Sequence, residues 1–323
     1  MKLYKKVMAI LLCAGCMLLA ACGKKTDPVA IRIASLKGPT TMGLVNLMQQ
    51  SENGMASNEY TFSMETDASV VLGQMISGDE DIALLPANVA AVLYQKTGQG
   101  IKVLNINTLG VLYFVSGDES IQSVEDLRGK TIALTGKGTT PDYALQKLLA
   151  AAGITLEEVT LEYKAEATEV ASLLANDSTI VGFLPQPFVT AALKQNDALS
   201  IRISADEAWK EFFGTELVTG VTVVRTEFLE AHEEAVREFL AEEKTSIEMA
   251  LSDVDATAEL IAKYGIVEKA PVAKAALPYC NIAYRDGETM KSALSAYLTT
   301  LFEMDPAAVG GALPGDDFYY EGL

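Results

Sequence analysis

Short apolar runs alternate with amphipathic segments along the first two thirds of the chain. Each run has the length of a β-strand and is followed by apolar positions three and four residues apart, a spacing typical of helices. Strands are expected at residues 31–36, 81–85, 102–106, 130–134, 161–163 and 180–184, and helices at 42–50, 89–95, 142–152, 168–175, 188–194, 226–241, 256–264 and 287–304. Apolar strands that alternate with helices predict an α/β fold with mainly parallel sheets flanked by helices.

Two apolar segments interrupt this alternation, because no helical pattern directly precedes them. They span residues 109–116 and 218–225. As antiparallel crossovers they would create two lobes, residues 30–112 plus 222–323 and residues 113–221, joined by a two-stranded hinge that can close over a ligand. As ordinary strands they would belong to one large sheet. A chain of about 300 residues exceeds the usual size of one hydrophobic core, which favours two lobes.

The N-terminus has the pattern of an export signal. Three lysines in residues 1–6 precede an uncharged run, residues 7–21, that is too short to span a bilayer comfortably. The run ends in Leu-Ala-Ala before Cys22, which resembles the lipobox of bacterial lipoproteins. This predicts a signal peptide over residues 1–21, lipidation of Cys22 and a polar tether over residues 22–29. An unlipidated signal peptide, or a short apolar helix that contains a cysteine, is the alternative.

Acidic residues outnumber basic ones. The chain has 43 Asp and Glu against 25 Lys and Arg, a net charge of −18, and removal of the three lysines before Cys22 would leave −21. Such a surface repels nucleic acid and anionic headgroups, so we expect no nucleic-acid partner and membrane contact only through the lipid. Cys280 would be the single free thiol of the mature chain, and its apolar neighbours favour a packed side chain over a reactive one.

Four strand-to-helix turns carry side chains suited to ligand binding. In open α/β sheets, ligands bind outside the carboxyl ends of strands, where helix N-termini present free N–H groups. The candidates are Gly38, Pro39, Thr40 and Thr41 in the first turn, Pro86 and Asn88 in the second, Gly138, Thr139 and Thr140 in the third, and Gln186 in the fourth. Two turns fall in each predicted lobe, so they could converge on one cleft. Alternatively, each polar residue only caps its helix.

Further candidates lie near the crossovers. Thr219 and Gly220 would leave room beside the cleft, or Gly220 would only bend its strand. Tyr113, Phe114 and Trp209 would either stack on a ring of the ligand or pack in the core. These alternatives depend on which side chains face the cleft.

An enzyme is the competing class, and the sequence offers little support for it. His232 is the single histidine of the chain, so neither a Ser-His-Asp triad nor a Cys/His zinc site can be assembled around a catalytic centre. Residues 136–140 are rich in Gly and Thr but lack the spacing of a phosphate-binding loop. We therefore expect no catalytic residue, no cofactor and no metal.

Several motifs resemble the type II periplasmic binding proteins. The chain carries the pattern S-x-x-D-L-x-G-K-x-I-A from Ser123 onward, together with the lipobox and the strand and turn at 81–86. The loop at 138–143, the segment 226–232 and the C-terminal stretches 310–314 and 318–320 are similar to the sulfonate-, nitrate- and thiamine-precursor-binding proteins, the SsuA/THI5-like group. The resemblance covers residues 30–323.

This resemblance implies an extracytoplasmic, monomeric lipoprotein that captures a small solute between two lobes and delivers it to an ABC permease with its ATPase. The group serves chemically diverse solutes, such as sulfonates, nitrate-like anions and pyrimidine precursors of thiamine. The scarcity of arginine in the candidate turns favours a small neutral or weakly anionic organic solute. A solute-sensing partner of a signalling receptor stays open as an alternative. Biosynthetic enzymes with this fold are cytoplasmic, and the lipobox disfavours them.

Overall fold

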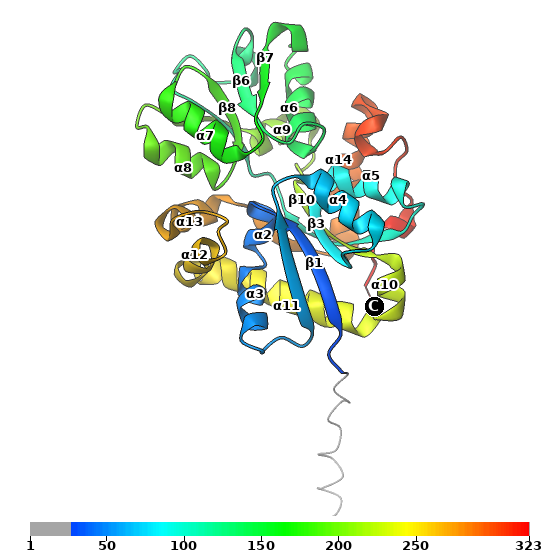
Figure 1. Ribbon diagram of the computed structural model, residues 1–323. Helices are drawn as coiled ribbons and strands as arrows, with labels where there is room; N and C mark the ends of the chain where they lie inside the picture. The colour runs from blue at the N-terminus through cyan, green and yellow to red at the C-terminus, as the bar shows by residue number, and fades with distance from the viewer. Residues whose placement is uncertain (1–26, 323) are drawn as a thin grey trace, which may run out of the picture.

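The computed structural model describes residues 27–322, so the predicted signal peptide and Cys22 lie outside the described residues. Two separate sheets, each flanked by helices, form two lobes that lie one above the other in Figure 1. The first and the last described segments both belong to the lower lobe. The α/β class and the two-lobe architecture expected from the sequence are confirmed.

The lower lobe contains a six-stranded sheet within residues 27–322, in the order β11-β4-β10-β3-β1-β2. Its strands are β1 (Ala30–Leu36), β2 (Glu59–Glu65), β3 (Ile82–Pro86), β4 (Ile101–Thr108), β10 (Gly220–Arg225) and β11 (Ile282–Arg285). Its helices are α2 (Pro39–Met42), α3 (Val45–Glu52), α4 (Ala68–Ser77), α5 (Ala87–Lys96), α10 (Thr226–Ala231), α11 (Glu233–Ser252), α12 (Val254–Lys263), α13 (Ala270–Ala276) and α14 (Gly287–Met304). Strand β1 is parallel to β2 and β3, whereas β10 is antiparallel to β3 and β4.

The upper lobe contains a five-stranded sheet within the same described range, in the order β7-β6-β8-β5-β9. Its strands are β5 (Leu112–Ser116), β6 (Thr131–Leu134), β7 (Thr160–Tyr163), β8 (Val181–Pro185) and β9 (Ser200–Ser204). Its helices are α6 (Thr140–Ala151), α7 (Ala167–Asn176), α8 (Phe188–Gln195) and α9 (Ala205–Phe213). Strand β6 is parallel to β7 and β8, and β5 is antiparallel to β8 and β9.

The described chain passes between the sheets twice, once between β4 and β5 and once between α9 and β10. Strands β5 and β10 lie in different sheets, which excludes the alternative of one large sheet. Both pair antiparallel with their neighbours, because each enters its sheet from the other lobe instead of through a helical crossover. The two connections are therefore the segments that any movement of the lobes would bend.

Several elements are missing from the sequence-based prediction: β2, α4, β9, α9, α13 and β11. Strands β2, β9 and β11 lie at edges of their sheets, where few side chains are fully buried, so their hydrophobic pattern is weak. The prediction of one helix at 226–241 is wrong, since α10 ends before His232 and α11 continues to Ser252.

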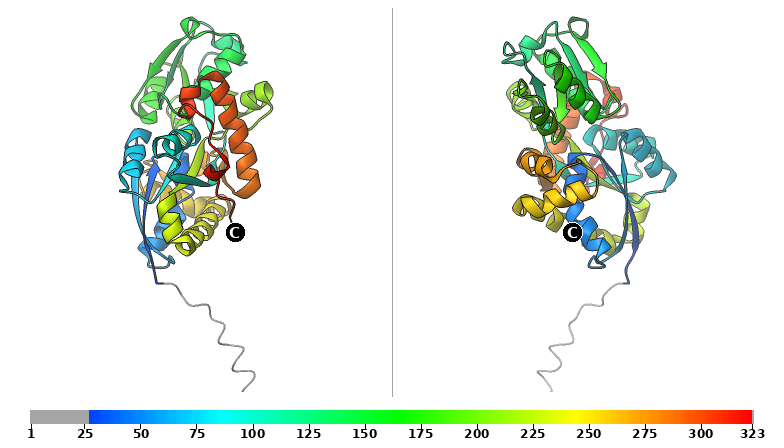
Figure 2. Two further views of the ribbon diagram at one scale, coloured as in Figure 1. Left: turned by 90° about the vertical axis from the view of Figure 1, so that its right-hand side faces the viewer. Right: turned by 60° about the vertical axis from the view of Figure 1, so that its left-hand side comes forward.

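The aromatic side chains considered for ligand stacking pack elsewhere. Phe114 is fully buried with its ring centroid 4.4 Å from that of Phe183, and the Tyr113 hydroxyl donates to the Tyr279 carbonyl at 3.2 Å. Trp209 on α9 is also fully buried, 5.4 Å from the ring of Tyr297 on α14. Helix α14 therefore packs against the upper lobe as well as its own, and Figure 2 shows it along the side of the molecule.

Cys280 and His232 have surroundings that suit packing or surface positions. Burial raises the pKa of the Cys280 thiol to about 12, so this thiol stays protonated and packs against the carbonyl of Ala276. It follows a 3₁₀ turn (Leu277–Tyr279) and not a strand edge. His232 is exposed at the junction of α10 and α11, with its ring 4.8 Å from that of Phe228.

Asp81 ties together three strands of the lower sheet. The carboxylate is 3% exposed and accepts hydrogen bonds from the backbone N–H of Arg32 at 3.0 Å, from the Arg32 guanidinium and from the Arg225 guanidinium. Burial alone would raise the pKa of Asp81, but the hydrogen bonds from both arginines outweigh it and lower the pKa. The carboxylate is thus held ionised beside β1, β3 and β10.

We predict that Asp81→Asn lowers the free energy of unfolding by about 2 kcal/mol, because both guanidinium groups lose their buried counter-charge. Urea denaturation measures this change. Asp79→Asn is the matched control, since Asp79 is exposed and touches neither arginine in the structure. Equal effects of the two substitutions would contradict a special role for Asp81.

A buried carboxyl group lies beneath the lower sheet without an ion pair in the described part of the chain. Glu243 on α11 is fully buried, and it accepts hydrogen bonds from Asn105 Nδ2 at 2.6 Å and from Thr222 Oγ1 at 2.7 Å. Burial raises the pKa of Glu243 to about 7. The folded protein therefore keeps this proton at pH values where the unfolded chain has released it.

This difference in pKa between the folded and unfolded states predicts that the free energy of unfolding falls as pH rises. Below the unfolded pKa of about 4.5 both states are protonated, and as pH rises to about 7 the unfolded state gains about 3 kcal/mol over the folded one. In Glu243→Gln this loss of stability is absent, because the side chain does not ionise. Asn105 Oδ1 is buried without a partner among residues 27–322, and its amide can turn so that this oxygen accepts from the new glutamine. Between pH 5 and pH 8, denaturation should show wild type losing about 2 kcal/mol relative to the variant. Parallel curves would contradict the raised pKa.

Candidate functional site

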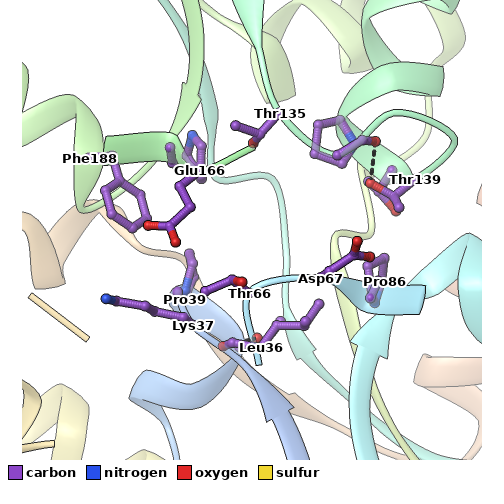
Figure 3. A pocket seen from close by; sticks show the side chains of 18 of the residues that line it. Leu36, Lys37, Pro39, Thr66, Asp67, Pro86, Thr135, Thr139, Glu166 and Phe188 are labelled. Atoms are coloured by element: carbon purple, nitrogen blue, oxygen red, sulfur yellow. Dashed lines mark hydrogen bonds between the residues drawn. The ribbon is translucent and has the colours of Figure 1, made fainter. Parts of the chain in front are cut away.

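A cavity of about 340 Å³ lies between the two lobes, at the carboxyl ends of parallel strands from both sheets. The lower lobe contributes the ends of β1, β2 and β3, and the upper lobe contributes those of β6, β7 and β8. Figure 3 shows the two groups of side chains facing one another. The first turns of α4, α6 and α7 also line this cavity, so the positive ends of these helices lie beside it.

The first predicted turn forms the cavity wall at the end of β1. Gly38, Pro39 and Thr40 line the cavity, and Gly38 has a φ of 154°, which favours glycine. The hydroxyls of Thr40 and Thr41 both donate to the Leu36 carbonyl, so they hold the turn closed. Thr41 is fully buried behind this wall and does not line the cavity.

Asn88 joins the two lobes instead of lining the cavity. Its Nδ2 donates to the carbonyl of Gly138 at 3.3 Å and to that of Ala308 at 3.2 Å, while its Oδ1 accepts from Thr140 Oγ1 at 3.3 Å. The side chain is fully buried. Pro86, two residues earlier, lines the cavity itself.

The loop between β6 and α6 is held by hydrogen bonds of its own. Thr139 and Thr140 line the cavity, and Thr139 Oγ1 donates to the Gly136 carbonyl at 2.6 Å. The Gly138 N–H donates to Asp142 Oδ2 at 2.7 Å, and the other oxygen of Asp142 accepts from the Tyr163 hydroxyl at 2.7 Å. Asp142 is a positioning residue that the sequence analysis missed.

The fourth turn and the second crossover contribute differently. Gln186 is buried, its Oε1 accepts from the backbone and hydroxyl of Thr190, and it does not line the cavity. Thr219 does line it, and its Oγ1 is buried without a partner among the described residues. Because this oxygen has almost no accessible surface, Thr219 presents other atoms to the cavity.

Gly220 supports the cavity from below. A Cβ at this position would lie 2.6 Å from Thr40 Cγ2 and 2.6 Å from Asn107 Oδ1. Glycine therefore allows the strand β10 to pass directly beneath Thr40. The pairing of β10 with β4 also shifts register between Gly220 and Val221, so both predictions for Gly220, room beside the cleft and a bend in the strand, stay open.

We predict that Gly220→Ala costs roughly 1–3 kcal/mol of folding stability, because Thr40 and Asn107 must move to admit the methyl group. Gly73→Ala is the matched control: Gly73 lies within α4, and a Cβ there meets no atom within 4 Å. That substitution should instead stabilise by up to roughly 1 kcal/mol. Chemical denaturation of both variants measures the difference, and a neutral Gly220→Ala would show that the floor of the cavity is loosely packed.

Two turns that line the cavity were not among the sequence candidates. The turn from β2 to α4 contributes Thr66, Asp67 and Ala68, and the turn from β7 to α7 contributes residues 164–168. Strand β2 has a weak hydrophobic pattern and was not predicted. The strand and helix on either side of the second turn were predicted at 161–163 and 168–175, but the turn between them was not taken as a binding site. Phe188, at the first position of α8, supplies an aromatic side chain to the lining.

Charged side chains line the cavity more densely than the sequence analysis expected. They are Lys37, Asp67, Lys137, Lys164 and Glu166. The Lys164 ammonium lies 2.9 Å from Glu162 Oε2, and the Lys137 ammonium lies 5.1 Å from the centre of the Tyr163 ring. The lining thus combines hydroxyls, an aromatic ring and charges of both signs.

Within residues 27–322, no group of three or more His, Cys, Asp or Glu side chains is arranged to hold a metal ion. The same part of the chain has no helix that is long and apolar enough to cross a membrane.

Comparison with solved structures identifies the fold as that of the periplasmic binding proteins. An ABC transporter structure from Parabacteroides distasonis matches with a TM-score of 0.76 and 23% identity, covering 92% of this chain and 100% of that one. The aliphatic sulphonate binding protein SsuA of Escherichia coli matches with a TM-score of 0.72 and 16% identity, and the match covers 92% of this chain and 94% of that one. A Candida albicans protein with the generic periplasmic-binding-protein fold matches with a TM-score of 0.60 and 14% identity, and the match covers 90% of this chain and 92% of that one.

The chain belongs to the NMT1/THI5-like family, whose model matches residues 61–256. Its curated relatives include a candidate binding protein of Brucella abortus, 24% identical over 169 residues, which are 52% of this chain and 51% of that protein. The chain therefore spans about half the length of the curated relatives it matches.

Proposed function

We propose that this protein is an extracytoplasmic solute-binding protein of an ABC importer and that it captures a small organic solute in the cavity between its lobes. The observation that carries the proposal is that turns from both sheets line one cavity. Family membership supports it, as do the names of structural neighbours, which include an ABC transporter protein and a sulphonate binding protein.

The proposed mechanism is closure of the lobes about their two connections. We take residues 30–112 plus 222–323 as one lobe and residues 113–221 as the other, boundaries that lie within two residues of the starts of β5 at Leu112 and β10 at Gly220. The hydrogen bonds of Asn88 and the packing of Trp209 on Tyr297 join the lobes on the side of α5, α6 and α14. On the side of α8 and α13, Lys194 Nζ donates to the carbonyl of Pro271 at 2.9 Å, so closure would bend the connections while contacts on both sides hold the lobes together. A ligand drives it only by binding the closed form more tightly than the open form.

The proposed cellular setting follows from the sequence. Lipidation of Cys22 after removal of residues 1–21 would tether a monomer to the outer face of the cytoplasmic membrane, beside a permease and its ATPase. The expected solute is a sulfonate, a nitrate-like anion or a pyrimidine precursor of thiamine. A sensing role beside a signalling receptor would use the same binding cavity, and the neighbouring partner would distinguish the two roles.

We predict that at least one solute from a panel of alkanesulfonates, nitrate, hydroxymethylpyrimidine, nucleobases and amino acids raises the melting temperature saturably. A ligand at one hundred times its Kd adds about 2.7 kcal/mol of stability. Lys37→Gln removes a charge from the lining and should weaken binding at least about tenfold, as expected for loss of a hydrogen bond to a charged group.

Lys96→Gln is the matched control, because Lys96 is exposed at the far end of α5 and outside the lining. The same loss in both variants would place the ligand elsewhere. Turnover of a bound compound into a product would overturn the proposal of a binding protein.

A further inference from the structure

Two carboxylates reach the cavity from opposite lobes. Asp67 is the N-cap residue of α4 in the lower lobe, and Glu166 is the N-cap residue of α7 in the upper lobe. Both line the cavity, and Figure 3 shows their side chains turned toward it from opposite sides. Both residues are exposed, so their carboxylates can be reached by a solute that enters the cavity.

Each carboxylate keeps one oxygen for a ligand. Asp67 Oδ1 accepts from the N–H of Ser69 at 2.8 Å, and Glu166 Oε2 accepts from the hydroxyl of Thr168 at 3.2 Å. No hydrogen bond to Asp67 Oδ2 or Glu166 Oε1 and no ion pair of either residue is found within the described part of the chain. A ligand cation or N–H group would therefore meet two unneutralised acceptors.

The basic side chains of the lining do not turn this cavity into an anion site. Lys164 is already neutralised by Glu162, which leaves Lys37 and Lys137 against Asp67 and Glu166. A simple anion would gain from the two lysines but would lie close to two carboxylates without counter-charges. A ligand with charges of both signs satisfies all four groups.

The surroundings of Glu166 suit a cation in particular. Phe188 lies next to it in Figure 3, and it is the one aromatic side chain among the described lining residues. A carboxylate beside the face or edge of an aromatic ring is a common arrangement for binding ammonium groups, through ion pairing and cation–π attraction. The net charge of −18 also attracts cationic solutes and repels simple anions.

We propose that Glu166 and Asp67 bind a cationic nitrogen of the solute, and that the solute is therefore amphoteric, with this nitrogen at one end and an acidic group at the other. This rests on the proposed solute-binding function. The acidic group would meet Lys37 or Lys137, the two lining lysines that have no ion pair within residues 27–322.

The test uses pairs of compounds that differ only in an amine: propane-1-sulfonate with 3-aminopropane-1-sulfonate, and butanoate with 4-aminobutanoate. Isothermal titration calorimetry of the purified protein should show the amine-bearing member binding at least about tenfold more tightly in one pair or both. Glu166→Gln should reduce this preference by about tenfold or more, because the amide carries no charge. Asp67→Asn should reduce it too, while asparagine still caps α4.

Glu169→Gln is the matched control, because it removes the same charge from an exposed position in the first turn of α7, outside the lining. It should leave the preference within about twofold of wild type. If Glu166→Gln weakens both members of a pair equally, Glu166 serves lobe closure, for example by pairing with Lys37, and the proposal is wrong.

Equal binding of both members by wild type, or binding of the amine-free member alone, would also overturn the amphoteric ligand while leaving a solute-binding protein. Absence of binding by all four compounds contradicts the amphoteric class as well. Binding of nitrate or a pyrimidine from the earlier panel would then still support the general function, so the two proposals fail separately.

Discussion

The double passage of the chain between two sheets is the constraint on which the rest of the structure depends. Because β5 and β10 each enter their sheet from the other lobe, the carboxyl ends of β1–β3 face those of β6–β8. Helix N-termini and polar turns then meet across one cavity without any long loop. The hydrogen bonds of Asn88 and the contact of Trp209 with Tyr297 join the lobes beside α5, α6 and α14. A second contact joins them at α8 and α13, where Lys194 Nζ donates to the carbonyl of Pro271 at 2.9 Å.

The wall of the cavity is held from beneath by polar groups that never touch it. Gly220 leaves space for Thr40 and Asn107, Asn107 Nδ2 donates to Thr222 Oγ1 at 3.1 Å, and Thr222 donates onward to Glu243. Every contact in this chain is buried, so each group depends on its neighbour for a hydrogen bond. Glu243 is the residue of this network whose burial costs the most free energy when it is ionised, because no base neutralises it within residues 27–322. Because burial raises the pKa of Glu243 to about 7, the stability of the network beneath β4 and β10 depends on pH.

Strong hydrophobic runs made the fold predictable, and weak ones hid part of the site. Strands β1, β3, β6 and β8 have mostly buried side chains, so their positions and the turns after them were visible in the sequence. Strand β2 is an edge strand in which Tyr60 alone is fully buried, and the turn that carries Asp67 was therefore missed. The roles of Thr41 and Asn88 needed the structure, because a threonine or asparagine at a helix start looks the same whether it faces a ligand, closes its own turn or bonds to another lobe.

The charges of the cavity raise a question that shape alone does not answer. Helix N-termini favour an anion, yet carboxylates stand at the N-cap positions of α4 and α7, and that of Asp67 already accepts from the first turn of α4. An anion in the cavity would have to share those helix ends with Asp67 and Glu166 in a space that loses water as the lobes close, where like charges repel most strongly. A cationic nitrogen placed between the two carboxylates removes that repulsion. It lets Lys37 and Lys137 hold an acidic group, so closure buries paired charges in place of opposed ones.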